Sequence, residues 1–192
     1  MKHSKDKHKE ESKETLVKVI ASNLFSLGKI FLVCLVLIYF LTNYIAIPVR
    51  VYQSSMSPTI KDGTLAIGNA FAGHFMDVER YDIVVAQKKG EAHYIIKRVL
   101  ALPGETIYAK DDVIYVNGEA IEEPYLNTNY VREYRDFGGG FTDDFEPVTL
   151  GEDEYFLVGD NRPPSIDSRQ LGAFHRDEIK AIGLFVIRSP KR

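Results

Sequence analysis

Three serine hydroxyl groups lie close together in the segment 53–60, which reads QSSMSPTI. A serine becomes a nucleophile when a neighbouring base removes its proton and hydrogen-bond donors stabilise the oxyanion that follows. The same residues are also typical of an ordinary turn, because serine hydroxyls bind nearby backbone and Pro58 fixes its own φ. Ser54, Ser55 and Ser57 are therefore candidate nucleophiles only if the chain also supplies a base.

Histidine is the usual base for a serine nucleophile, and three histidines follow residue 8 of this chain. His74 lies in the apolar segment 70–76, His93 begins a predicted strand, and His175 lies in the polar segment 174–177. None of these patterns requires a base. We interpret all three as ordinary surface or half-buried histidines.

A lysine is the other candidate base, provided that its pKa is lowered. In the segment 94–100, YIIKRVL, the period of a strand places Ile95, Lys97 and Val99 on one face and Arg98 on the other. A lysine desolvated among apolar side chains loses pKa and accepts a proton near neutral pH. Alternation alone leaves two roles open for Lys97: a buried base, or a structural lysine that reaches water or pairs with an acid.

The residues before the serine-rich segment are apolar enough to span a membrane. The stretch 30–41, IFLVCLVLIYFL, has no polar face, which argues against a buried core helix. A bilayer core needs about 20 helical residues, and 24–47 supplies them. Tyr44 stands two places before Ala46, which disfavours a cleavable signal peptide. We predict a cytoplasmic tail over 1–23, a transmembrane helix over 24–47 and an extracytoplasmic catalytic domain over 48–192.

Charge is spread unevenly along the chain. Residues 1–29 carry seven lysines against four acids, while the whole chain has a net charge of −3. Lysines before an apolar helix favour a cytoplasmic amino terminus. The remainder is mildly acidic, which argues against a nucleic-acid partner. Cys34 is the single cysteine, so the chain builds neither a disulfide nor a cysteine metal site.

The residues after the apolar segment predict antiparallel β-structure. Asn117-Gly118 lies between alternating apolar residues and favours a type I′ hairpin over 113–121. The residues 127–147 include three consecutive glycines and show no sustained period, so we predict a long mobile loop there. Other predicted strands, chosen by alternation or β-branched content, cover 64–67, 81–87, 92–100, 155–158 and 179–187. The fold class is therefore all-β, with one preceding helix.

Four segments carry a family likeness in their order and spacing. They are 55–59 (SMSPT), 81–85 (YDIVV), 97–105 (KRVLALPGE) and 159–169 (GDNRPPSIDSR). Together they resemble bacterial type I signal peptidases, and the single amino-terminal anchor is similar to the Gram-positive branch. The resemblance implies a partly open antiparallel barrel and a serine endopeptidase that removes signal peptides from secreted preproteins at a lipid bilayer. It implies no cofactor and no metal.

The same resemblance implies a serine/lysine dyad. Ser55 corresponds to the nucleophile and Lys97 to the general base, whereas chemistry alone left Ser54 and Ser57 open. Ser165 corresponds to a hydroxyl that hydrogen-bonds the lysine and orients it.

Further roles follow by the same carry-over. Gln53 stands where some relatives have a serine that helps to bind the oxyanion, so the oxyanion hole rests mainly on the backbone N–H of Ser55. Four charged residues resemble a salt-bridged frame beneath the site: Arg98, Asp160, Asp167 and Arg169. Three apolar residues are candidate walls of shallow substrate pockets: Val51, Met56 and Ile96.

Two other readings belong to different functional classes. A non-enzymatic relative of the same fold, acting in surface-fibre assembly, need not keep both Ser55 and Lys97, and this chain has both. A self-cleaving repressor-type protease conflicts with the predicted anchor and with the absence of a DNA-binding motif.

Overall fold

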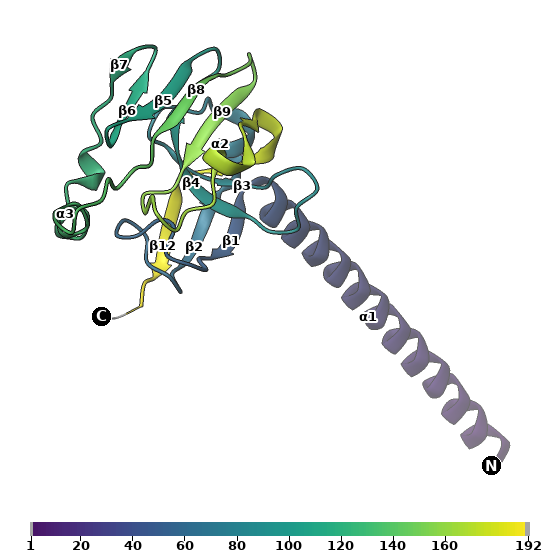
Figure 1. Cartoon of the computed structure of the whole chain (residues 1–192). Helices are drawn as coiled ribbons and strands as arrows, with labels where there is room; N and C mark the ends of the chain where they lie inside the picture. The colour runs from purple at the N-terminus through teal and green to yellow at the C-terminus, as the bar shows by residue number, and fades with distance from the viewer. Residues whose placement is uncertain (1, 191–192) are drawn as a thin grey trace. The chain divides into compact units, whose positions relative to one another are not determined.

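The structure is a computed structural model that describes residues 2–190, with side chains described from Ile20 onward except at positions 21 and 43. The chain divides into two compact units, one up to Thr42 and one from Asn43. The first unit lies in a single helix, α1 (Lys2–Tyr44), drawn in purple in Figure 1. Its segment Ser22–Thr42 has a mean hydropathy of 2.5 and is long enough to cross a membrane.

Helix α1 ends before the predicted boundary at residue 47. Ala46 and Ile47 instead begin strand β1 (Ala46–Arg50), where they pair with Asn69 and Gly68. Ile47 packs against the apolar core of the second unit. Apolar character alone does not distinguish the last turn of a spanning helix from the first residues of a half-buried strand, which explains the error.

The second unit consists of three antiparallel sheets (Figure 1), which confirms the predicted all-β class. The first sheet has the order β1-β2-β12, with β2 (Leu65–Asn69) and β12 (Leu184–Arg188). The second has the order β10-β9-β4-β3-β11, formed by Phe174–His175, Glu154–Val158, Ile95–Ala101, Ile83–Ala86 and Ile179–Ile182. The third has the order β7-β6-β5-β8, formed by Glu119–Ala120, Val113–Val116, Thr106–Lys110 and Phe145–Thr149.

The turns explain how these strands are connected. Asn117 and Gly118 both have positive φ, 53° and 83°, which confirms the type I′ hairpin between β6 and β7. The predicted strand region 179–187 is divided at Gly183, whose φ of 77° breaks the extended backbone. Its first half pairs with β3 and its second half with β2, so this segment links two sheets.

The prediction of a structureless loop over 127–147 was wrong. The segment contains helix α3 (Asn129–Asp136) and the first residues of β8. Thr128 caps α3 by accepting the N–H of Val131, and Val131 is buried against Phe141. One buried residue in an otherwise polar eight-residue helix gives too weak a period to detect. Four other short helices complete the unit: α2 (Ala70–Phe75), α4 (Ser168–Leu171), η1 (Pro124–Leu126) and η2 (Arg176–Glu178).

Strand β4 lies at the centre of the second unit. Its residues enter three apolar clusters: Leu100 packs with the third sheet, Val99 with β9 and β11, and Ile96 with Val51 and Met56. Both faces of β4 are therefore buried from Ile96 to Ala101. Any polar side chain on this strand is withdrawn from water and must find its partner inside the protein.

Candidate active site

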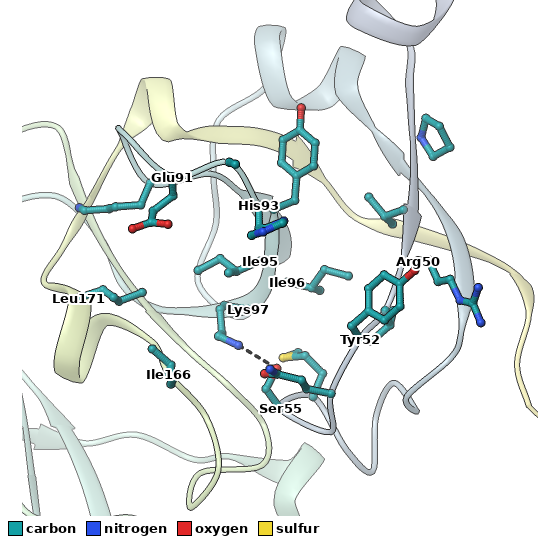
Figure 2. Close-up of a pocket in the computed structure, with 18 residues that line it drawn as sticks. Arg50, Tyr52, Ser55, Glu91, His93, Ile95, Ile96, Lys97, Ile166 and Leu171 are labelled. Atoms are coloured by element: carbon teal, nitrogen blue, oxygen red, sulfur yellow. Dashed lines mark hydrogen bonds between the residues drawn. The ribbon is translucent and has the colours of Figure 1, made fainter.

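Lys97 and Ser55 meet at the start of strand β4 (Figure 2). Lys97 Nζ donates a hydrogen bond to Ser55 Oγ over 2.8 Å, and only 3% of Lys97 is exposed. By contrast, no hydrogen bond joins His74, His93 or His175 to Ser55 among the described residues. The structure therefore brings together the serine and the lysine of the implied dyad.

The pKa of the Lys97 amine is lowered toward neutral pH. Burial lowers its pKa from 10.5 to about 8; Asp167 raises it, Arg169 lowers it and Asp160 raises it again by smaller amounts. No ion pair within 4.0 Å joins Lys97 to a carboxylate in the part of the chain that the structure describes. The lysine is thus a desolvated amine beside a hydroxyl.

A close approach of backbone to backbone brings the segment 159–169 against Ser55. A Cβ built on Gly159 would lie 2.2 Å from Ser165 Oγ and 2.5 Å from the Ser55 carbonyl oxygen. Both distances are far below contact, so only glycine fits at this position. The Gly159 N–H donates to Asp167 over 3.0 Å.

Ser165 is buried and joined to the same carboxylate. Its hydroxyl donates to Asp167 Oδ2 over 2.6 Å, and 2% of the residue is exposed. No hydrogen bond joins Ser165 to Lys97 among residues 2–190, so the direct contact that the resemblance implies is not formed in this arrangement. Ser165 is connected to the site through Asp167 and through its packing against Gly159.

Two buried ion pairs connect the four predicted frame residues. Arg169 binds Asp167 through Nε and Nη2, each over 2.9 Å. Burial alone would raise the pKa of the Asp167 carboxyl, but hydrogen bonds from Arg169, Gly159 and Ser165 outweigh it and hold that pKa below its usual range. Arg98 binds Asp160 in bidentate fashion over 2.8 and 2.7 Å.

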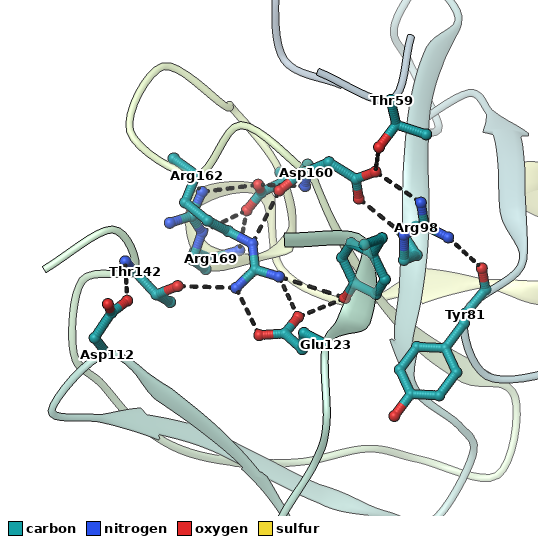
Figure 3. A network of polar contacts seen from close by, with 12 residues as sticks. Thr59, Tyr81, Arg98, Asp112, Glu123, Thr142, Asp160, Arg162 and Arg169 are labelled. Atoms are coloured by element: carbon teal, nitrogen blue, oxygen red, sulfur yellow. Dashed lines mark hydrogen bonds and ion pairs between the residues drawn. The ribbon is translucent and has the colours of Figure 1, made fainter. Parts of the chain in front are cut away.

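The Arg98 guanidinium is enclosed on every side (Figure 3). It donates to the Tyr81 carbonyl over 2.9 Å and lies 3.9 Å from the centre of the Tyr125 ring. Asp160 also accepts a hydrogen bond from Thr59, which follows Ser55 in the chain. This pair therefore connects strand β4 with the serine-rich turn.

Arg162 is a residue of the site region that sequence reasoning missed. It is 1% exposed, pairs with Glu123, and donates to Thr142 over 2.9 Å and to the Gly159 carbonyl over 3.0 Å (Figure 3). These contacts join the segment around α3 to the segment 159–169. The motif GDNR contains Arg162, but its partner Thr142 lies in the segment 127–147 that was predicted to be a loop, and Glu123 lies just before that segment.

Gln53 adopts a left-handed backbone conformation two residues before Ser55. Its φ is 74°, a region that favours glycine, and its N–H donates to Asp62 over 3.0 Å. The Gln53 side chain is exposed and makes no hydrogen bond to any described residue. Its geometry is consistent with a side chain that is free to turn toward a ligand.

A groove of about 700 Å³ opens in front of the dyad (Figure 2). Ser55, Lys97 and Gln53 line it together with the three predicted pocket residues, Val51, Met56 and Ile96. Those three are buried, and they also belong to one apolar cluster of the core. Among the side chains that the structure describes, no group of three His, Cys, Asp or Glu is placed to hold a metal ion.

Comparison with known proteins identifies the family. The family described as "Signal peptidase, peptidase S26" matches residues 24–188. The chain belongs to the signal peptidase I family. It is 38% identical to signal peptidase I of Bacillus amyloliquefaciens over 160 residues, which cover 83% of this chain and 85% of the relative. It is 36% identical to signal peptidase I T of Bacillus subtilis over 160 residues, with coverage of 83% and 82%.

Among solved structures, a signal peptidase I from Enterococcus faecalis is similar at 31% identity and a TM-score of 0.49, covering 55% of this chain and 96% of that one. Membership of peptidase family S26 makes the chain a serine peptidase, that is, a hydrolase. The family likeness seen in the four sequence segments is thereby confirmed.

Proposed function

We propose that this chain is a membrane-anchored endopeptidase that removes signal peptides from translocated preproteins, with Ser55 as nucleophile and Lys97 as general base. One observation carries the proposal: a buried lysine with a pKa of about 8 lies 2.8 Å from a serine hydroxyl at the end of a groove. The relatives named signal peptidase I supply the substrate class.

The geometry supports a two-step hydrolysis. Neutral Lys97 takes the Ser55 proton as Oγ attacks the carbonyl carbon of the peptide bond, and the lysinium then donates that proton to the leaving amine. Lys97 next removes a proton from water, which attacks the acyl-enzyme ester; the ester bond to Ser55 Oγ breaks, and Lys97 returns the proton to that oxygen. The Ser55 N–H makes no hydrogen bond to any described residue and is free to bind the oxyanion, with Gln53 as a second candidate donor.

Two unpaired strand edges flank the groove. Strand β1 is an edge strand of its sheet, and β4 pairs with β9 only from Arg98 onward, so Ile95 and Ile96 are paired with β3 alone. A preprotein segment in extended form fits here as an added strand, with backbone hydrogen bonds to 49–53 and 94–96. Val51, Met56 and Ile96 would then limit the size of side chains near the cut.

The apolar helix supplies the membrane anchor in this proposal. Lysines precede the segment Ser22–Thr42, which favours a cytoplasmic tail over 1–23 and an extracytoplasmic catalytic domain. Phe71, Phe75 and Met76 of the α2 region are each more than half exposed, so they are not core residues. They offer an apolar surface suited to the outer leaflet.

The decisive test is cleavage of a preprotein in detergent or lipid by four single variants. We expect Ser55→Ala and Lys97→Ala each to lower kcat/KM by at least about a thousandfold, because the nucleophile and its base act as a unit. Matched controls are Ser57→Ala in the same turn and Lys89→Ala, an 83% exposed lysine. Covalent labelling by a serine-acylating penem should be lost in Ser55→Ala. Wild-type cleavage by Ser55→Ala or Lys97→Ala would refute the dyad.

A further inference from the structure

Asn161 holds the nucleophile segment through two separate hydrogen bonds. Its backbone N–H donates to the Ser55 carbonyl over 3.0 Å, and its side-chain Nδ2 donates to the Ser54 carbonyl over 3.0 Å. Asn161 is 3% exposed, so neither donor has ready access to water instead. The peptide units before and after the Ser55 α-carbon are therefore both fixed by one residue.

The bond to the Ser54 carbonyl has a consequence for the Ser55 N–H. These two groups belong to the same peptide unit, which is planar and trans, so the carbonyl and the N–H point in opposite directions. The Ser54 carbonyl is held by Asn161 Nδ2 and by the Ser57 N–H over 2.9 Å. Holding the carbonyl on one side of the peptide plane aims the Ser55 N–H to the other side, where it makes no hydrogen bond to a described residue.

Tyr130 anchors the end of the Asn161 amide that faces away from Ser54. An asparagine side chain carries a donor NH₂ and an acceptor oxygen of nearly equal size, and only the NH₂ can bind a carbonyl. The Tyr130 hydroxyl donates to Asn161 Oδ1 over 3.0 Å, which leaves Nδ2 toward Ser54. With the amide turned over, its oxygen would face the Ser54 carbonyl oxygen and that hydrogen bond would be lost, although the Tyr130 hydroxyl could still accept from Nδ2.

Helix α3 gives Tyr130 a fixed position. The Tyr130 ring packs edge-on against Phe141, with ring centres 6.2 Å apart, and Phe141 is 1% exposed. Arg135 of the same helix pairs with Asp112 over 2.6 Å. Helix α3 thus places the Tyr130 hydroxyl against the segment 159–169. Tyr130 is not one of the residues to which the family likeness assigned a role.

We propose that Asn161 and Tyr130 are positioning residues that aim the Ser55 N–H at the oxyanion of the acylation step. The inference rests on the proposed function, because it takes Ser55 as the nucleophile. It predicts a particular kind of defect: the transition state loses stabilisation while ground-state binding of the preprotein is retained. It also predicts that Tyr130 acts only through Asn161.

The first test is Tyr130→Phe, which removes one hydroxyl from a 42% exposed residue. We expect kcat for preprotein cleavage to fall about 3- to 10-fold, the scale of one neutral hydrogen bond, with KM and the acid limb of the pH profile unchanged. Tyr134→Phe is the matched control. Tyr134 lies on α3 and packs on the same Phe141 ring, and its hydroxyl makes no hydrogen bond to a described residue. Equal kcat values for Tyr130→Phe and Tyr134→Phe would overturn the inference.

The second test is a double-mutant cycle with Asn161→Asp, which keeps the shape but replaces the donor to Ser54 by an acceptor. We expect kcat to fall about 10- to 100-fold, which is no more than the fall in kcat caused by removing a whole oxyanion-hole donor. Adding Tyr130→Phe to this variant should change kcat no further, because its effect passes through Asn161. If Tyr130→Phe lowers kcat by the same factor in both backgrounds, Tyr130 acts by another route and the inference fails.

Failure of the inference is distinguishable from failure of the proposed function. If Ser55→Ala cleaves like the wild type, the nucleophile assignment falls and the positioning pair falls with it. If cleavage requires Ser55 but Tyr130→Phe retains the wild-type kcat, only the positioning pair is refuted. The thermal midpoints of Tyr130→Phe and Tyr134→Phe should agree, which separates a defect in positioning from a loss of folded protein.

Discussion

Two neighbouring cations on strand β4 are buried in opposite ways. Lys97 and Arg98 are 3% and 8% exposed, and their side chains leave opposite faces of the strand. Arg98 meets a bidentate carboxylate, a carbonyl and an aromatic face. Lys97 meets a hydroxyl, with no ion pair among the described residues. The charge of Arg98 is therefore balanced by a neighbouring carboxylate, whereas Lys97 on the other face has no such partner among the described residues.

The difference separates what holds the fold from what performs chemistry. The paired Arg98 guanidinium positions Asp160, which in turn accepts a hydrogen bond from Thr59 of the serine-rich turn. An uncompensated ammonium is unstable where it lies, so it gives up its proton more readily and becomes a base. The stability cost at Lys97 is therefore the source of its reactivity in the proposed mechanism.

The largest expected effect on stability is on the Arg98 face. Arg98→Met should lower the free energy of unfolding by about 3–5 kcal/mol, because it leaves the Asp160 carboxylate buried without its partner. Urea denaturation of the full chain in detergent at pH 7, followed by near-ultraviolet circular dichroism, would measure it. Arg80→Met is the control, since the Arg80–Glu105 pair is partly exposed, with side chains 24% and 18% accessible. Equal losses in the two variants would show that burial of the Arg98–Asp160 pair is of no special importance.

Lys97→Met, by contrast, should raise the free energy of unfolding at pH 7. The unfolded lysine binds its proton up to pH 10.5 and the folded one releases it at about 8, so the unfolded state binds more protons between these values. Wild-type stability therefore rises with pH through this window, and at pH 7 the folded protein carries the full cost of the buried charge. We expect Lys97→Met to be more stable than wild type at pH 7 and its advantage to shrink by about 2 kcal/mol between pH 7 and pH 10.

The same denaturation series, run at several pH values, checks this prediction. Lys89→Met is the control, because the Lys89 side chain is 83% exposed and its replacement removes no buried charge. A pH-independent difference between Lys97→Met and wild type would mean that the lysine is not desolvated in the folded protein.

The contrast between Lys97 and Arg98 also shows which features of the site could be predicted from the sequence. Alternation in the segment 94–100 correctly predicted that Lys97 and Arg98 leave opposite faces of a strand, but not that both faces are buried. Burial of the second face depends on Tyr125 and Asp160, which come from distant parts of the chain. Long-range partners of this kind leave no local pattern.

The antiparallel class and the hairpin at Asn117-Gly118 were readable because turn chemistry and alternation are local signals. Helix α3 was missed because Val131 is its single buried residue. Tyr130 was missed with it, although its hydroxyl lies within hydrogen-bond distance of Asn161 in the segment 159–169. Contacts between two residues of the sequence motifs could be predicted. Contacts between a motif residue and a residue outside the motifs, such as Tyr130, could not.

The smallest expected effect is on the rate of preprotein cleavage, and it tests Lys97 without involving Arg98. Below its pKa of about 8 the lysine is protonated and cannot accept the Ser55 proton. The kcat/KM of the full chain should therefore fall about tenfold for each pH unit below that value, for a substrate without titratable groups near the cut. The limb should persist in Tyr130→Phe, which does not touch the amine. A profile that is flat from pH 6 to about 9 would contradict a neutral lysine as base, because the fraction of neutral Lys97 changes steeply over that range.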